Sequence, residues 1–303
     1  MLSPQPPQKL VITRTFDSLE QALVKIETEP YNKDLLSANS RSSVTGDFEF
    51  TQTNSLPEAI ALARNGWPLG NEIISKLTKE HSEMFIKLFP KQDWAIQLLP
   101  DVAGETINMD AVLTGQPETM MHFDVDQEKL QKNQAGKMQR IIIDTEFPWF
   151  IKPDTIFNRG AIVCSMINTM ELSGFRTELW VTNCRHSINA DVNSRVTYYY
   201  KIKSFDEDLN LNKLSFVACH PSMLRRIQFA LLEQEPYDYI PAAYIYSGYG
   251  VPADITKEEI EKFGGELQYG NIYFEKLDDN RDFATLLADT KVKIEKHFST
   301  IKI

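Results

Sequence analysis

From Gln139 onward, short apolar runs alternate with segments that have the residue types typical of helix ends. The runs predicted to be strands are QRIIID, FRTELWVTN, RVTYYYKIK, LSFVACH, AAYIYS and GNIYFEKL. The predicted helices between and after them are RGAIVCSMINTMELSG, PSMLRRIQFALLEQE, ITKEEIEKFGG and NRDFATLLADTKVKIEKHF. Continuous apolar runs are typical of strands buried on both faces. The alternation therefore predicts an α/β fold, a mainly parallel sheet flanked by helices.

The aromatic run RVTYYYKIK fits this pattern less well, and we expect it to be an edge strand or an antiparallel strand. Before Gln139 the signals are mostly helical. Ser18 and Gln21 form one capping pair and Ser55 and Glu58 another, so helices are predicted over 14–27 and from Leu56.

A further helical spacing of apolar residues covers 71–89. Three parts of the chain follow from these signals: a disordered lead-in over 1–12, a mostly helical N-terminal domain over 13–136, and the α/β domain over 137–303. The Pro- and Gln-rich first residues suggest the lead-in, and the polar run before residue 137 suggests the boundary.

Composition excludes several classes of protein. Hydrophobic residues make up 42% of the 303, and the formal net charge is -10, so the chain can bury a core but repels phosphate backbones overall. Cys164, Cys184 and Cys219 contain no CxxC pair, which favours buried thiols over a zinc site or disulfides. Without an apolar run of about 18 residues or a signal core, we expect a soluble, intracellular protein and no membrane partner.

In open α/β sheets, ligands bind beyond the carboxyl ends of the strands. Asp144, Thr145 and Glu146 follow the first of these strands and could ligate a hard cation such as Mg²⁺. The supplementary oxygen donors would be Asp154, Thr155 and Asp191. Alternatively, Asp144 caps its loop or pairs with Arg159.

Four further residues are expected at the same rim of the sheet: His220, Ser222, Ser247 and Tyr249. Ser222 lacks the GxSxG pattern of a nucleophile elbow, and the loop SGYGVP matches neither GxGxxG nor a P-loop. The sequence therefore contains no complete catalytic constellation.

A nucleic-acid alternative rests on interleaved aromatic and basic residues, because bases stack on aromatic rings while cations contact phosphates. The candidate residues are Tyr198, Tyr200, Lys201, Lys203, Arg225 and Arg226.

Two segments, TNSLPEAIALARNGWPLG and FNRGAIVCSMINTMELSGFRTELWV, resemble a family of uncharacterised bacteriophage proteins. The second half is also similar to a von Willebrand factor A domain, in which an apolar strand ending in Asp is followed by a loop, a helix and a second strand. That family's metal motif is Asp-x-Ser-x-Ser. Asp144 matches its first position, but Glu146 and Pro148 replace the two serines. The resemblance therefore implies a Rossmann-like scaffold that makes protein contacts without the ion.

These observations favour a non-catalytic phage accessory protein that binds a host or phage protein in assembly, regulation or counter-defence. Homo-oligomerisation is an open alternative. The expected location is the host cytoplasm, with the virion as the other candidate. Single-stranded nucleic-acid binding and a divalent-metal-dependent enzyme acting on phosphate esters remain the other two hypotheses.

Overall fold

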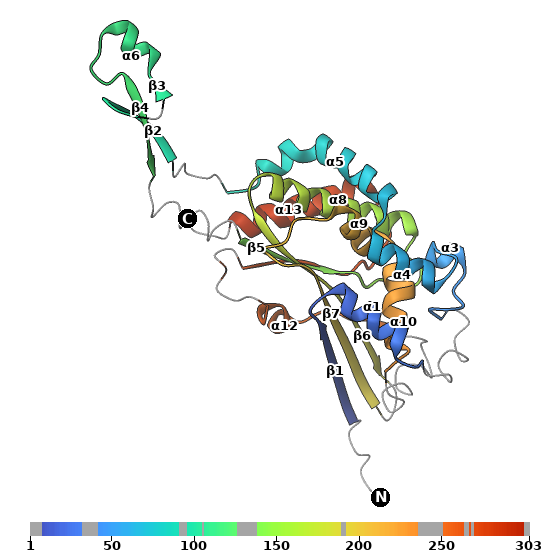
Figure 1. Ribbon diagram of the computed structural model, residues 1–303. Coiled ribbons are helices and arrows are strands. Elements are labelled where there is room, and N and C mark those ends of the chain that lie inside the picture. Colours follow the sequence, from blue (N-terminus) through green and yellow to red (C-terminus); the bar gives the residue numbers. More distant parts are fainter. Residues whose placement is uncertain are drawn as a thin grey trace, which may run out of the picture.

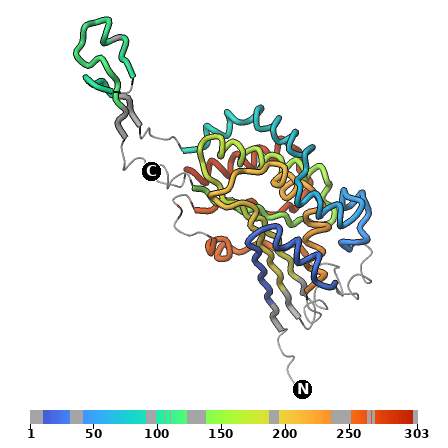
Figure 2. Tube along the Cα trace, in the orientation of Figure 1, coloured from blue at the N-terminus to red at the C-terminus, as the bar shows by residue number. Residues whose placement is uncertain are grey.

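The computed structural model describes residues 8–31, 42–90, 96–104, 106–125, 138–188, 192–235, 251–263, 267 and 270–299. Figure 1 shows a main body, in which helices are stacked against a twisted sheet, and a small second sheet set apart from it. The trace in Figure 2 shows β1, from near the N-terminus, lying beside strands from the middle of the chain.

The main sheet is mixed and mainly parallel. Its strands are β1 (Gln8–Phe16), β5 (Met138–Asp144), β6 (Arg176–Ile188), β7 (Val192–Lys203), β8 (Val251–Pro252) and β9 (Asn271–Phe274). The order is β1-β7-β6-β5-β9, with β8 paired to β6. The pairs β1–β7, β5–β6 and β5–β9 are parallel, whereas β6–β7 and β6–β8 are antiparallel. The predicted fold class is therefore confirmed at the level of a mainly parallel sheet flanked by helices.

The longer helices begin only partly where the sequence predicts, since Ser18 and Ser55 cap two of them as expected but the helix predicted from Arg159 begins at Pro153. They are α1 (Leu19–Thr28), α4 (Leu56–Asn65), α5 (Pro68–Ile86), α8 (Pro153–Leu172), α9 (Leu211–Cys219) and α13 (Phe283–Ser299). Shorter helical segments are α3 (Phe48–Thr51), η1 (Met223–Gln228), α10 (Phe229–Leu232) and α12 (Lys257–Glu261). Ser18, Ser55 and Thr256 accept hydrogen bonds from backbone N–H groups in the first turn, which satisfies donors that the helix leaves open.

The two faces of the sheet bury different clusters. On β5, Ile141 and Ile143 belong to the large core under the helices, while Ile142 faces a smaller cluster that includes Ile260 and Phe263 around α12. This alternation follows from the two-residue period of a strand. The large core contains residues from Phe16 to Phe298, so it draws on both sides of the predicted boundary near residue 137.

A second sheet comprises β2 (Ile96–Asp101), β3 (Thr106–Ile107) and β4 (Met120–Val125), in the antiparallel order β2-β4-β3, with helix α6 (Met109–Thr114) between β3 and β4. Together with β1, these strands give the N-terminal part a larger β content than the mostly helical one predicted. In the described part of the chain, no helix is long and apolar enough to cross a membrane.

Several predicted elements differ from the structure. LSFVACH lies in helix α9, because Asn210 caps it and its apolar residues pack between helices rather than against strands. Strand β1 starts at Gln8, so 8–12 belong to the sheet and not to a disordered lead-in, and the helix predicted over 14–27 begins only at Leu19. RVTYYYKIK is antiparallel to β6 as expected, but β1 covers its other edge. The run AAYIYS lies outside the described residues.

Candidate functional site

The carboxyl end of β5 places the Asp144 carboxyl group in the interior, with no exposed surface. Its Oδ1 accepts a hydrogen bond from the backbone N–H of Glu146 (2.9 Å), which closes the loop on itself. Its Oδ2 accepts from the hydroxyl of Tyr273 on β9 (2.9 Å). Burial raises the pKa of Asp144 to about 8, because removal from water disfavours the charged form more than these donors favour it.

The side chain of Glu146, two residues further on, is fully buried and ion-paired with Arg185 of β6. The Arg185 Nε donates to Glu146 Oε2 over 2.9 Å, and its Nη2 donates to Oε1. The guanidinium also lies 4.8 Å from the centre of the Phe229 ring. Burial raises the pKa of Glu146, and the Arg185 charge opposes that shift. A protein cation therefore already occupies the position at which a metal would neutralise this carboxylate.

The remaining polar groups of this loop also have protein partners. The Thr145 hydroxyl donates to Thr182 O (3.2 Å) and accepts from Gln228 Nε2 (2.8 Å). Arg159 of α8, considered above as a partner for Asp144, donates instead to the carbonyls of Phe274 (3.2 Å) and Glu275 (2.7 Å).

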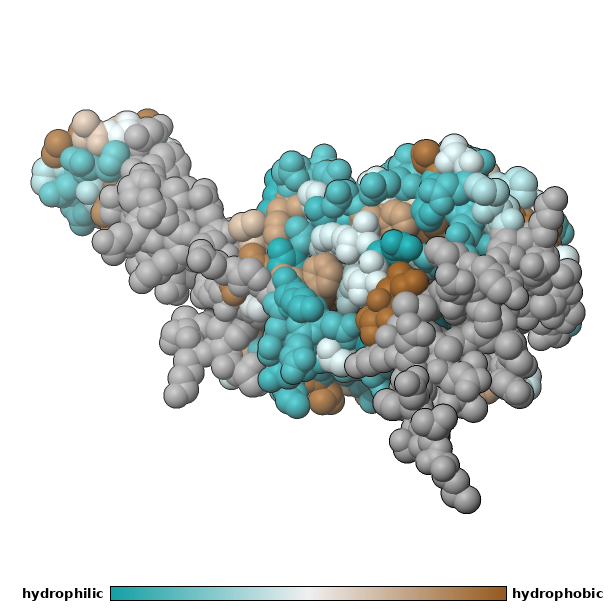
Figure 3. All heavy atoms as spheres, turned by 90° about the horizontal axis from the view of Figure 1, so that it is seen from below, coloured by the Kyte–Doolittle hydropathy of each residue, from teal (hydrophilic) through white to brown (hydrophobic). Residues whose placement is uncertain are grey.

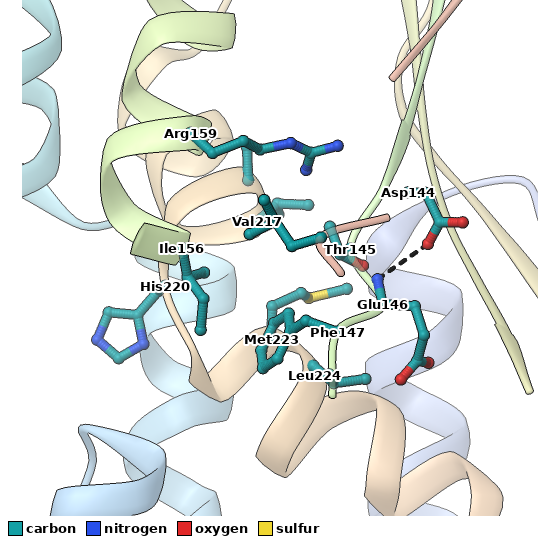
Figure 4. Close-up of a pocket in the computed structure, with 12 residues that line it drawn as sticks. Asp144, Thr145, Glu146, Phe147, Ile156, Arg159, Val217, His220, Met223 and Leu224 are labelled. Atoms are coloured by element: carbon teal, nitrogen blue, oxygen red, sulfur yellow. Dashed lines mark hydrogen bonds between the residues drawn. The ribbon is translucent and has the colours of Figure 1, made fainter. Parts of the chain in front are cut away.

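The cavity at this end of β5 has a volume of about 10 Å³, which is room for one water molecule. In Figure 4 the Asp144, Thr145 and Glu146 side chains come from one loop, and apolar side chains such as Ile156 and Met223 fill the space beside them.

These donors do not fit Mg²⁺, which needs several oxygen ligands around one point together with retained water. Thr155 is buried and donates to Asn280, Asp154 is exposed on the first turn of α8, and Asp191 lies outside the described residues. Across the part of the chain that the structure describes, no group of three or more His, Cys, Asp or Glu side chains is arranged to hold a metal.

His220 follows α9 and lines the same cavity, on the opposite side from Asp144 (Figure 4). Its Nδ1 accepts from the N–H of Ser222, and its ring packs edge-on against Trp67 with centroids 4.9 Å apart. Burial lowers the pKa of His220 to about 4, so the ring is neutral near pH 7. Ser222 is fully buried, and its hydroxyl bonds with Thr53. Ser247 and Tyr249, the other predicted rim residues, lie outside the described residues.

The residues of the nucleic-acid alternative are mostly internal. Five of the six are buried, namely Tyr198, Tyr200, Lys203, Arg225 and Arg226. Lys203 Nζ donates to Thr177 O over 2.7 Å, and Lys201 lies over the Trp180 ring, 5.0 Å from its centre. These six side chains therefore do not combine into an exposed track on which bases could stack.

The loop that continues from the site, 147–152, presents two aromatic side chains to solvent. Trp149 is 77% exposed and Phe150 is 47% exposed, and their rings lie edge to face with centroids 6.0 Å apart. The ends of the loop are fixed, because Phe147 and Ile151 are buried and Arg225 Nη2 donates to Ile151 O over 3.0 Å.

The side chain of Asn280 also holds loop 147–152 in place through two hydrogen bonds. Its side-chain amide donates to Phe150 O (3.2 Å) and its Oδ1 accepts from the N–H of Lys152 (2.8 Å). Sequence reasoning missed this pair of exposed aromatics, as well as Arg185 and Tyr273. The available signal was the run Phe-Pro-Trp-Phe in a predicted loop, since a loop seldom needs three aromatic residues for packing alone.

These observations define an α/β protein with a buried, charge-compensated loop at the carboxyl end of strand β5 and exposed aromatics beside it. The chain belongs to the family described as "Domain of unknown function (DUF7192)", whose model matches residues 7–303. No curated protein and no solved structure matches the chain.

Proposed function

We propose that this protein acts by binding another protein, without catalysis, through a von Willebrand A-like scaffold. The arrangement of β5, α8, β6 and antiparallel β7, with β9 on the other side of β5, supports this relationship. In the corresponding loop, Asp144 is bound by Tyr273 and Glu146 by Arg185, so the scaffold keeps its loop conformation through internal contacts.

The observation that carries the proposal is the Trp149–Phe150 pair on its anchored loop. Large aromatic side chains supply most of the binding energy at many protein interfaces. Such side chains bind more tightly when they are held in place before the partner arrives, because less conformational entropy is lost. The buried ends of loop 147–152 and the Asn280 contacts provide this fixed geometry.

The partner is a protein of the host cell or of a bacteriophage, and the proposed setting is virion assembly, control of a host or phage machine, or counter-defence. The proposed location is the host cytoplasm or the virion. The phage setting rests on the resemblance of TNSLPEAIALARNGWPLG and FNRGAIVCSMINTMELSGFRTELWV to phage proteins.

The test compares the wild-type protein with the double variant Trp149→Ala/Phe150→Ala. Each is tagged and purified from cells in which the chain is naturally expressed, and light scattering measures the mass of the complexes. Leu172→Ala is the matched control, because Leu172 is a large apolar residue, 75% exposed, at the other end of α8.

We expect the wild type and the control to recover a stoichiometric partner or to self-assemble, and the double variant to lose the interaction at an unchanged melting temperature. A wild-type protein that stays monomeric and recovers no partner contradicts the proposal. So does a double variant that binds as well as the wild type.

A further inference from the structure

We call the small sheet with helix α6 the β2–β4 arm (residues 96–125). This arm contains many of the large apolar side chains that the described chain leaves exposed to solvent. Six of them are Leu99 (43% exposed), Val102 (69%), Ile107 (59%), Met109 (59%), Val112 (46%) and Leu113 (78%). Among the arm residues whose side chains the structure describes, only Ala111 is fully buried. Of the arm side chains that the structure describes, none belongs to either hydrophobic core cluster.

These side chains come from β2, β3, α6 and the turn after β2, so the apolar surface belongs to the arm as a unit. Figure 3 shows hydrophobic and hydrophilic residues side by side at the end of the arm. Several large apolar side chains left exposed on one small unit indicate an interaction surface.

The negative charge of the arm indicates which kinds of partner it can bind. Its sequence has five acidic residues, Asp101, Glu105, Asp110, Glu118 and Asp124, and contains no Lys or Arg. The arm thus accounts for half of the formal net charge of -10 of the chain, and the remainder of the chain is also acidic. A second copy of the chain carries a net charge of the same sign as the arm, which disfavours self-association, and nucleic acids and anionic lipid surfaces are repelled for the same reason.

We propose that the β2–β4 arm binds a cationic, amphipathic segment of a partner protein. Lys and Arg side chains of the partner pair with exposed acidic residues such as Asp101 and Glu118, while its apolar side chains cover residues such as Val112 and Leu113. Long-range attraction between opposite charges speeds the encounter, and burial of the apolar groups retains the partner. This surface is separate from the Trp149–Phe150 pair, so each can be tested alone.

The experiment measures fluorescence anisotropy of a labelled amphipathic helical peptide of about 18 residues built from Leu and Lys, added to the full-length protein. The matched probe replaces every Lys with Glu. One variant, Val112→Ser/Leu113→Ser, removes apolar surface. A second, Asp101→Asn/Glu118→Gln, removes charge at exposed positions and leaves Asp101 Oδ1 able to accept from the N–H of Val102. Leu172→Ser in the main body is the control.

We expect the Lys peptide to bind the wild type and the control equally, and more weakly as NaCl is raised from about 0.05 to 0.3 M. Each arm variant should raise Kd by about tenfold or more, and the Glu peptide should not bind.

Four results would overturn the proposal: no binding of the Lys peptide, equal binding of both peptides, binding unaffected by both arm variants, or sedimentation that shows self-association through the arm. The result for Trp149→Ala/Phe150→Ala in the same assay should equal that for the wild type, which separates this proposal from the proposed function.

Discussion

Arg226 is completely buried in the η1 segment, and replacing it tests how the N-terminal part is held to the body. Its guanidinium donates to six oxygens: Ser43 O (2.7 Å), Val44 O (3.1 Å), Gly46 O (2.7 Å), Thr53 O (2.9 Å), Thr51 Oγ1 (3.1 Å) and Thr53 Oγ1 (3.2 Å). All six acceptors lie in the segment 43–53, so this one side chain makes more hydrogen bonds to the loop than the other residues that hold it, such as Glu233 and Arg225.

Arg226→Met keeps much of the volume and removes every donor. A buried acceptor left without a partner costs about 1–3 kcal/mol, and water that enters the relaxed loop restores some of the bonds. Because four of the acceptors are backbone carbonyls, we expect a loss of about 3–5 kcal/mol in the free energy of unfolding, similar to breaking a buried ionic contact. Arg226→Lys should recover only part, because an ammonium group has three donors.

The assay is urea unfolding followed by circular dichroism. Arg176→Met is the control, because the Arg176 side chain is 57% exposed and its ion pair with Asp208 is 3.9 Å long, so its loss should cost less than about 0.5 kcal/mol. If Arg226→Met lies within about 1 kcal/mol of the wild type, the six contacts do not stabilise the loop as argued. If Arg226→Lys is as stable as the wild type, the geometry of the guanidinium is not what matters.

Three further outcomes are expected. Burial raises the pKa of Asp144 to about 8, so its stabilising contribution is complete below about pH 4 and is lost as the pH rises to about 8. The free energy of unfolding of Asp144→Asn, measured across this range beside the wild type, should therefore lack that decline. If the free energies of the two proteins fall in parallel with pH, the pKa of Asp144 is not raised. Millimolar Mg²⁺ or Mn²⁺ should leave the melting temperature unchanged, because Glu146 is already ion-paired, whereas a clear rise would reveal a metal site. Gly160→Ala should lower the free energy of unfolding, measured in urea titrations, by about 2 kcal/mol or more, because the new Cβ would lie 2.2 Å from Ala218 O. The control is Gly115→Ala, whose new Cβ meets no neighbour and which should cost only about 1 kcal/mol for its positive φ. Equal losses in the two variants would contradict this packing argument.

Local signals in the sequence were sufficient for several helix starts and for strands β5, β6, β7 and β9. Ser55 with Glu58, and Thr256 with Glu259, start helices as expected, because capping depends on residues only three positions apart. LSFVACH shows the limit of this reasoning. A short, wholly apolar run fits a buried helix as well as a buried strand, and only its neighbours in space decide between them.

The candidate site shows the same division. The sequence predicted Asp144 at a strand end, and Asp144 is the last residue of β5. The partners of these carboxylates come from residues 39 and 129 positions away, Arg185 and Tyr273. The aromatic and basic residues of β7 and η1 looked like a surface for nucleic acid, but tertiary packing buried five of the six.

The sequence by itself determined the class of fold, because the period of apolar residues and the capping groups act over a few neighbouring positions. Tertiary structure alone decided which charges face each other, since β5, β6 and β9 become neighbours only when the sheet forms. It also decided that Trp149 and six large apolar side chains of the β2–β4 arm are exposed. The exposure of a side chain depends on the packing of the whole chain, which local patterns indicate only in part.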